Sequence, residues 1–353
     1  MAKLTEPTFK ANKIGQREDL ADLISQVDAK ETPFTSMAPK KSKPGNTFFQ
    51  WQVESLPTPR LGGVLDGSDV DPTDNAQVEN YTKDGATQYR HQIGTYIQKF
   101  RRVVRVSDLT EDLNTVAGVK SELARNVAKA VQVIKRDMEI TFCSSQDHQE
   151  DNGTNPYLTR GLDKWLDDTI AGSGVYTVPT AFRVPTASRA TGSVNDLTEA
   201  KIQNVMTSIY EQTGETRQFD ALVGTALKRA FTNLVFNTPS SGGTETRTAV
   251  RTLNREAKDS TYISNIDVFK GDFGGIRLHP SVWLKWGSVT AGQPNPYVGY
   301  IIPFNMLDVR YGGNVAGVYE LTNNGGGEGR RIEAIAALCV HNPLAFGVLE
   351  FTA

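Results

Sequence analysis

The chain has 353 residues, of which 38% are hydrophobic and 22% are charged. Its 38 basic and 40 acidic residues leave a net charge of −2. This balance argues against a dedicated binder of nucleic acid or of anionic membranes, because such proteins carry a large basic excess. At roughly 150 residues per domain, the length predicts two compact domains with some additional chain.

No segment predicts secretion or membrane insertion. Residues 1–15 lack the apolar stretch of a signal peptide. The longest weakly polar run, 335–340 with its flanks, is far shorter than the roughly 20 residues that cross a bilayer. The two cysteines, Cys143 and Cys339, are too far apart to define a disulfide framework, so we expect both to be small buried side chains in a reducing cytoplasm.

Residues 1–47 are predicted to form an arm rather than a domain. An amphipathic helix is indicated within 16–28, because four apolar residues fall on one helical face. These residues are Leu20, Leu23, Ile24 and Val27. Pro33 favours an extended conformation at the preceding residue and stops any helix there. The stretch 37–45 is polar, basic and interrupted by proline, so we expect a partner to order it.

Residues 48–106 are predicted to form a long two-stranded β-ribbon that extends from the rest of the chain. In 48–53, aromatic and β-branched residues alternate with glutamine, and 91–106 alternates in the same way on the return. About forty residues rich in Gly, Pro, Asp and Asn separate the two strands, and a loop of that length is usually functional. Because a lone two-stranded ribbon is marginal in water, we expect it to lie on a neighbouring subunit.

Residues 112–145 carry the strongest helical pattern, with apolar residues at steps of three or four. At 1.5 Å per residue such a helix is about 50 Å long.

A second helix is predicted to be capped by Asn195 or Asp196 and to end at Gly214. Further along, the patterns predict a strand at 219–224, a helix at 225–236, a flexible loop at 238–248, and β-structure at 262–269, 275–279, 297–311 and 331–341. The predicted fold class is α+β.

Catalytic and cofactor-binding motifs are missing from the sequence. There is no phosphate-binding loop, nucleophile elbow or zinc-binding helix. None of the four histidines stands at metal-ligand spacing from another histidine or a cysteine. Cys143 and His148 are close in sequence, but the flanking residues are ordinary. We therefore predict no catalytic residue, no metal and no cofactor, and a structural role is favoured.

Two charged clusters could each be either ordinary charged surface or a binding site. The aspartates within 66–74 fail the calcium-loop pattern, which needs Gly at its sixth and Glu at its twelfth position, so a solvated loop tip is expected. The basic run consists of Lys99, Arg101, Arg102 and Arg105. We expect it to form ion pairs with acidic groups of a neighbouring chain, and direct phosphate binding is the alternative.

Five features, in this order, resemble one known family. They are Arg17-Glu18-Asp19-Leu20 followed by Glu31-Thr32-Pro33-Phe34, an aromatic strand with Phe49 and Trp51, Gln92-Ile93, Val106-Ser107, and a helix with Ser121-Glu122-Leu123-Ala124 and Lys135-Arg136-Asp137-Met138-Glu139. The features resemble those of the major head proteins of tailed bacteriophages. The likeness covers 14–145 and elsewhere rests on element order, and it departs from the family at the ribbon tip, 65–69.

The resemblance implies the HK-ninety-seven-like capsid fold. The implied parts are an N-terminal arm (1–47), an extended loop (48–106), a peripheral domain (107–160) with a spine helix (112–145), a mainly axial domain (161–330) and a returning C-terminal strand (331–353). The implied function is that of a non-enzymatic major capsid protein. It would form hexamers and pentamers of an icosahedral virion shell around double-stranded DNA, without sequence-specific binding, after assembly in the bacterial cytoplasm.

The implied partners are copies of the chain, a portal protein, a scaffolding protein and a decoration protein. Because the signature begins by residue 17, we expect the scaffold to be a separate protein, and we expect no covalent crosslinks. The residues expected at contacts between subunits are Arg17, Glu18, Leu20, Leu23, Ile24, Val27, Glu31, Pro33, Phe34, Met37, Phe49, Trp51, Lys99, Arg101, Arg102 and Arg105. The anchors among them are the large apolar side chains of 34, 37, 49 and 51.

Three alternatives compete with this interpretation. The first is an encapsulin-like compartment shell, which has the same fold but holds protein cargo. The second is a soluble enzyme without a recognisable motif. The third is another β-rich virion protein, such as a tail or decoration protein, which the long helix behind a long ribbon argues against.

Overall fold

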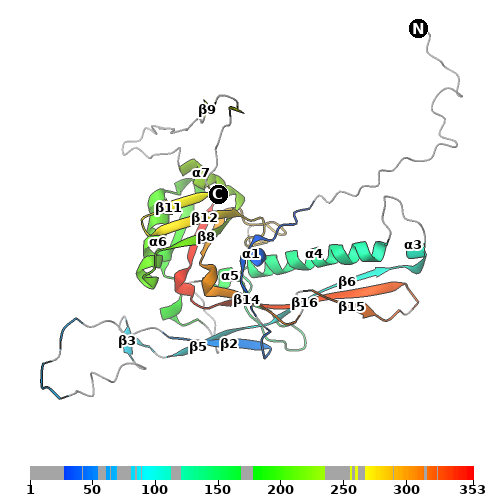
Figure 1. The fold of residues 1–353 in the computed structure, drawn as a ribbon, viewed down its shortest axis with the longest axis horizontal. Helices are drawn as coiled ribbons and strands as arrows, with labels where there is room; N and C mark the ends of the chain where they lie inside the picture. The colour runs from blue at the N-terminus through cyan, green and yellow to red at the C-terminus, as the bar shows by residue number, and fades with distance from the viewer. Residues whose placement is uncertain are drawn as a thin grey trace, which may run out of the picture. The chain divides into compact units, whose positions relative to one another are not determined.

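The computed structural model describes residues 28–41, 43–54, 61–63, 65–69, 81–83, 86–88, 90–112, 121–167, 178–234, 255–256, 259–260, 267–288, 290–313, 316–323 and 325–353. These residues form both helices and strands (Figure 1), and the strands come in runs rather than in alternation with helices, which confirms the α+β class. The chain divides into a smaller unit, Met1–Lys30, Arg101–Val133 and Val318–Ile332, and a larger unit, Glu31–Phe100, Ile134–Gly317 and Glu333–Ala353.

The smaller unit contains the first residues of one long strand, 328–332, and the rest of that strand, 333–340, belongs to the larger unit. This strand is β16 (Glu328–Val340), and both β15 (Gly317–Leu321) and β6 (Gln98–Val106) pair with it. The short helix α3 (Asp108–Asp112) follows β6. Gly327, just before β16, has a φ of +97°, and a side chain there would strike the carbonyl oxygen of Val106. Glycine is therefore required at this turn.

The larger unit is built on a six-stranded sheet in the order β11-β12-β8-β13-β17-β7. The strands are β7 (Arg189–Ser193), β8 (Arg217–Val223), β11 (Val268–Gly271), β12 (Gly274–Pro280), β13 (Val298–Ile302) and β17 (Gly347–Thr352). β8 is parallel to β12, and β17 is parallel to β7, whereas β13 runs antiparallel to both β8 and β17. The strand predicted at 219–224 is thus confirmed as β8.

Two helices lie beside this sheet and bury their apolar faces on it (Figure 1). They are α6 (Glu199–Thr213) and α7 (Thr225–Leu234). Their fully buried residues include Ile202 and Val205 on α6 and Leu227 and Phe231 on α7. The helix predicted at 225–236 is confirmed as α7 up to residue 234, and the remainder lies outside the described residues.

The ends of α6 show which part of the capping prediction was wrong. Gly214 ends the helix in the left-handed conformation, with φ +67°, as predicted. The N-cap, however, is Thr198, whose hydroxyl accepts a hydrogen bond from the amide of Lys201 at 3.4 Å. Asn195 and Asp196 instead belong to a separate 3-10 turn, Val194–Asp196, after which the chain extends before the helix begins.

Alanine in place of Gly274 is expected to lower the free energy of unfolding by about 3 kcal/mol. The φ of Gly274 is +134°, and an added Cβ would strike the carbonyl oxygen of Arg217 on the neighbouring strand. The left-handed conformation alone costs about 1–2 kcal/mol, and the clash adds to it. Urea denaturation measures the loss. Gly292→Ala is the control, because its φ is also positive but no atom lies within 4 Å; equal losses in both variants would contradict the prediction.

The long helix α4 (Glu122–Phe142) has 21 residues, so it is shorter than the predicted helix at 112–145. The Ser121 hydroxyl accepts a hydrogen bond from the Ala124 amide at 3.1 Å, which marks the N-terminus of the helix. The preceding helix α3 ends at Asp112, and 113–120 lie outside the described residues. At 1.5 Å per residue, α4 is about 30 Å long rather than about 50 Å. None of the helices within the described residues combines the length and the apolar character needed to cross a membrane.

The remaining elements are short. In the larger unit, β1 (Lys40–Lys41) runs parallel to β14 (Leu307–Tyr311), and β14 pairs antiparallel with β16. The others are α1 (Pro33–Met37), α5 (Leu162–Trp165), β2 (Phe48–Val53), β5 (His91–Tyr96), and the small hairpins β3 (Tyr81–Lys83) with β4 (Ala86–Gln88) and β9 (Arg255–Glu256) with β10 (Asp259–Ser260).

Candidate functional site at the base of the ribbon

The strands β2 and β5 form an antiparallel pair, here called the ribbon, in which Trp51 stands opposite Ile93. This confirms the predicted pairing of 48–53 with the first part of the returning stretch 91–106. The second part of that stretch, 98–106, forms β6 and pairs with β16 instead of with β2. The side chains of Gln50 and Gln52 are exposed, whereas Ile93 and Thr95 are buried. The expectation that a neighbouring subunit supports the ribbon was therefore incomplete, because residues of the same chain cover its base.

Five stacked groups, here called the ladder, hold one face of β2. Arg310 places its guanidinium 4.0 Å from the ring centroid of Phe49, which lies 5.6 Å from the ring of Trp51. Trp51 lies 5.5 Å from the ring of Trp165, and the guanidinium of Arg160 lies 4.7 Å from that ring on α5. Cations are attracted to aromatic faces at distances below about 6 Å. The ladder thus joins β2 to β14, α5 and the loop before α5.

The other face of the ribbon is covered by the loop that follows α4. The ring of Tyr96 stacks on Tyr157 at 5.5 Å and meets Phe48 edge-on at 4.7 Å. A Cβ on Gly94 would lie only 2.7 Å from the ring of Phe48, so the glycine makes room for this ring. His148 adds a third contact, with its ring 5.9 Å from that of Tyr96. Both faces of the ribbon are therefore held at its base.

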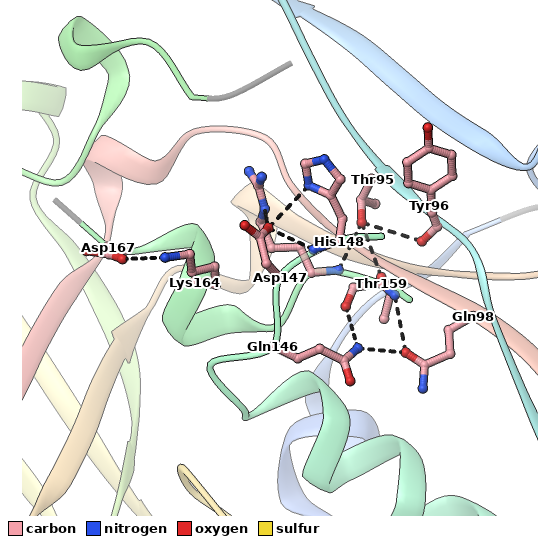
Figure 2. Close-up of polar contacts among 10 residues, drawn as sticks. Thr95, Tyr96, Gln98, Gln146, Asp147, His148, Thr159, Lys164 and Asp167 are labelled. Carbon is pink, nitrogen blue, oxygen red and sulfur yellow. Dashed lines mark hydrogen bonds and ion pairs between the residues drawn. The ribbon is translucent and has the colours of Figure 1, made fainter. Parts of the chain in front are cut away.

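Hydrogen bonds of polar side chains, with one another and with backbone groups, join β5 and β6 to the same loop (Figure 2). The amide of Gln146 donates to Gln98 Oε1 and to the carbonyl oxygen of Thr159, both at 2.8 Å. Gln98 Oε1 also accepts from the Thr159 amide at 3.2 Å. Thr95 Oγ1 accepts from the backbone amide of Arg160 at 3.0 Å. Because most of these groups are shielded from water, each one needs its partner, and the network fixes one arrangement of strand and loop.

Charge is concentrated at Asp147 and Arg160. The Arg160 side chain is only 1% exposed, and its Nε donates to Asp147 Oδ1 at 2.8 Å. Burial alone would raise the pKa of Asp147, but hydrogen bonds from His148 and the charge of Arg160 outweigh it and hold that pKa well below its usual range. Burial also lowers the pKa of Arg160, which Asp147 partly offsets. The pair therefore stays ionised at neutral pH.

Asparagine in place of Asp147 is expected to lower the free energy of unfolding by about 2 kcal/mol at neutral pH. Removing one member of a buried pair costs about 3–5 kcal/mol, and water at Asp147, whose side chain is 44% exposed, reduces that loss. The wild-type contribution is fully present above the ordinary aspartate pKa of about 3.9. It is lost as the pH falls toward the lowered folded pKa.

Urea denaturation at several pH values measures this difference between wild type and Asp147→Asn. It should stay constant from neutral pH down to about pH 5 and shrink below about pH 4. Glu150→Gln is the control on the same loop, because Glu150 is exposed, and it should change stability by less than about 0.5 kcal/mol. A difference that persists unchanged at pH 3 would argue against the ion pair.

Within the larger unit, a buried carboxylate holds the segment 31–41. The two oxygens of Glu139 accept hydrogen bonds from the backbone amides of Phe34 and Thr35, each at 2.8 Å. Glu139 is fully buried, and burial raises its pKa although the two amides partly lower it again. The ring of Phe34 is also fully buried, with the rings of Phe142 and Phe304 at 6.3 and 6.2 Å. Phe34 therefore belongs to the core of its own chain, and its predicted contact with another subunit stays a prediction.

Two further contacts fix this segment. The indole nitrogen of Trp283 donates to the carbonyl oxygen of Glu31 at 2.7 Å. Lys40 and Lys41 pair with β14, next to a hydrogen bond from the Val309 amide to the Pro39 carbonyl oxygen at 2.9 Å. The expectation that only a partner would order the stretch 37–45 was therefore wrong for β1, because a strand of the same chain supplies the hydrogen bonds.

The other residues predicted at subunit contacts fall into three groups. Residues 1–27, and with them Arg17, Glu18, Leu20, Leu23, Ile24 and Val27, lie outside the described residues. Glu31 is exposed, and Pro33, Met37, Phe49 and Trp51 are half-buried. The basic residues Lys99, Arg101, Arg102 and Arg105 are exposed on β6, and Lys99 pairs with Glu333 of its own chain at 3.1 Å. Contact of these residues with another subunit stays a prediction.

The site carries little chemistry beyond binding. Burial raises the pKa of the Cys143 thiol well above its usual range, so the thiol remains protonated and is a poor nucleophile. Within the described residues, no group of three His, Cys, Asp or Glu side chains could hold a metal ion. The arrangement instead holds two segments, the ribbon and the turn at α1, against the rest of the larger unit.

Comparison with known proteins gives a consistent result. The profile of the SU10 major capsid protein family matches residues 5–353. The major capsid protein of Escherichia phage Phieco32 is 34% identical over 161 residues, which make up 45% of this chain and 40% of that protein. The match therefore spans less than half of the length of this curated relative.

Solved structures show the same fold at low sequence identity. The capsid of cyanophage A-1(L) has a TM-score of 0.61 at 12% identity, with 95% of this chain and 96% of that chain covered. The SrpI encapsulin of Synechococcus elongatus has a TM-score of 0.50 at 10% identity, with 99% and 96% covered. The fold is thus that of phage capsid proteins, and the encapsulin likeness is the weaker of the two.

Proposed function

Because the chain belongs to the SU10 major capsid protein family, we propose that its copies assemble as hexamers and pentamers into the icosahedral head of a tailed bacteriophage, around double-stranded DNA. The observation that carries the proposal is the family match over 5–353, nearly the whole chain. The chain is a structural protein and not an enzyme. Its small net charge of −2 agrees with enclosure of DNA without sequence-specific binding.

The ribbon supports an assembly role through its position. Its base is held on both faces, while the exposed glutamines of β2, Gln50 and Gln52, leave polar surface for a neighbour. Each contact between subunits needs only modest strength, because a closed shell engages many contacts at once. The exposed basic residues Arg102 and Arg105 on β6 would pair with acidic groups of an adjacent copy.

The proposed partners follow from the family. They are further copies of the chain, a portal protein and a separate scaffolding protein, with a decoration protein as an addition to the outer surface. Assembly would take place in the cytoplasm of the bacterial host. Co-expression with each candidate from the same phage genome, followed by microscopy of the particles, tests these partners one at a time.

A compartment shell that holds protein cargo is the second candidate function. The fold likeness to the SrpI encapsulin, with a TM-score of 0.50, favours it, whereas the family match favours a virus head. The two functions differ in contents. Nuclease-protected double-stranded DNA inside particles isolated from infected cells would support the head, and enclosed protein without DNA would support the compartment.

Negative-stain microscopy of the purified protein, together with its mass by light scattering, tests the shell directly. Closed particles, or rings of five and six subunits, are the expected result. The measurement should be repeated after co-expression with the scaffolding protein. A chain that stays a 38.7 kDa monomer under both conditions would contradict the proposal.

A further inference from the structure

We propose that the ladder of Arg310, Phe49, Trp51, Trp165 and Arg160 fixes the direction in which the ribbon leaves the larger unit, and thereby determines the size of the shell. The inference rests on the proposed function, because shell size has a meaning only if the chain forms shells. The role that it assigns to these five residues is to position the ribbon through contacts within their own chain.

The first step is that the ribbon needs external support. A two-stranded ribbon is at best marginally stable in water. Its described contacts with the body run along both strands, through the ladder, through His91 on Phe182, and through Phe48 and Tyr96 on the loop after α4. These contacts decide the orientation of the described part of the ribbon, and the ladder is the set that holds β2.

The second step is that ladder contacts depend on direction. Aromatic rings prefer particular offset or tilted arrangements, and cations prefer ring faces. Apolar burial, in contrast, has no preferred direction. A tilt of β2 would move Phe49 away from Arg310 and Trp51 away from Trp165 at the same time. An aliphatic side chain at 49 would keep the burial but lose the preference.

The third step is that both cations of the ladder are themselves fixed. Arg310 Nε donates to Asp308 Oδ1 at 3.2 Å, and Asp308, whose side chain is only 2% exposed, also contacts His341 at 2.7 Å. At the other end, the almost fully buried Arg160 is held by Asp147. The ladder therefore has two anchored ends, and the two rings that β2 contributes are held between them.

The fourth step connects this direction to the particle. A ribbon acts as a lever, so a small tilt at its base becomes a larger displacement further along. In a shell of hexamers and pentamers, the angles between neighbouring subunits must add up to a closed surface, so a wider range of angles permits particles of other sizes or open aggregates. Loosening the ladder should therefore widen the range of particle sizes.

Three substitutions separate direction from stability. Phe49→Leu removes the ring from the ladder but keeps an apolar side chain, whereas Phe49→Tyr keeps the ring. Phe231→Leu is the matched control, because it removes a ring from the core beside the six-stranded sheet, where Phe231 is 1% exposed. Because Phe231 is more deeply buried than Phe49, this control should lose at least as much stability.

The first measurement is the distance between spin labels on the ribbon and on the body of the unassembled chain. Cysteines at the exposed positions Gln52 and Asp272 would carry the labels, and the native Cys143 and Cys339 are fully buried and so protected from labelling. Phe49→Leu should at least double the width of the distance distribution. Phe49→Tyr and Phe231→Leu should leave it unchanged.

The second measurement is the diameter of the particles by cryo-electron microscopy. Phe49→Leu should give a mixture of diameters, and the other two variants should give the single wild-type diameter. An unchanged distance distribution in Phe49→Leu, or equal changes in Phe231→Leu, would overturn the inference. If the wild type forms no particles, the proposed function fails, while the label distances still decide whether the ladder sets the direction of the ribbon.

Discussion

Alanine in place of Glu139 is expected to lower the free energy of unfolding by about 2–4 kcal/mol at neutral pH. The carboxylate is fully buried and accepts the backbone amides of Phe34 and Thr35, which would both lose their partner. A buried donor without a partner costs about 1–3 kcal/mol. Denaturation in urea measures the loss, and faster proteolysis before Phe34 would show that the segment has detached.

The pH dependence of this loss has a defined sign. Burial raises the folded pKa of Glu139 above that of the unfolded chain, which is about 4.3. The stabilisation by Glu139 is therefore complete below about pH 4.3 and decreases as the pH rises through the folded pKa. The difference between wild type and Glu139→Ala should be larger at pH 5 than at pH 8. A difference that grows with pH would contradict the raised pKa.

Glu139→Gln is the matched control for charge. Its amide oxygen can still accept one of the two backbone amides, so it should lose less stability than the alanine variant. It should also remove the pH dependence, because it does not titrate. A glutamine variant as unstable as the alanine variant would show that the charge, rather than the hydrogen bonds, holds the turn.

The second large effect is expected for Trp165→Ala, which should lower the free energy of unfolding by about 3–5 kcal/mol. Trp165 is fully buried, and its removal leaves a cavity between Trp51 and the guanidinium of Arg160. Guanidinium chloride denaturation measures the loss. Protease cleavage within the ribbon should also become faster, because the ladder is broken in its middle.

Trp165→Phe is the matched control for this substitution. It keeps an aromatic face for both neighbours and should lose less than half as much stability as the alanine variant. Trp286→Ala provides a second comparison, since Trp286 is half-buried and lies outside the ladder. Cleavage of the ribbon at the wild-type rate in Trp165→Ala would contradict a supporting role for the ladder.

Local patterns predicted those elements that depend on neighbouring residues in the sequence. The alternation in 48–53 and in the first part of 91–106 predicted the ribbon, and Gly214 predicted the end of α6. The start of α6 was wrong because Asn195 and Thr198 are both good caps, and only the turn at 194–196 decides between them. The predicted length of the long helix was wrong because an apolar spacing does not show at which residues a helix begins and ends, here Glu122 and Phe142.

The site itself was only partly predictable. Phe49 and Trp51 were recognised as anchors from their size and alternation, but their partners in the ladder could not be found, since Arg310 is remote in sequence and resembles any surface arginine. Glu139 was seen only as part of a family motif, although the amides that it binds are 104 and 105 positions away. Buried polar contacts of such long range leave no periodic signal in a sequence.

The strand order of the six-stranded sheet affects how the chain can be made. β7 pairs with β17, and their contact residues Arg189 and Glu350 are 161 positions apart. A ribosome adds roughly 5–20 residues per second, so β7 waits on the order of ten seconds for its neighbour. A chain broken off before Gly347 lacks the strand between β13 and β7. Translation products that lack β17 therefore cannot join β7 to the rest of the sheet. Only chains that contain this strand can reach the folded state from which copies would assemble.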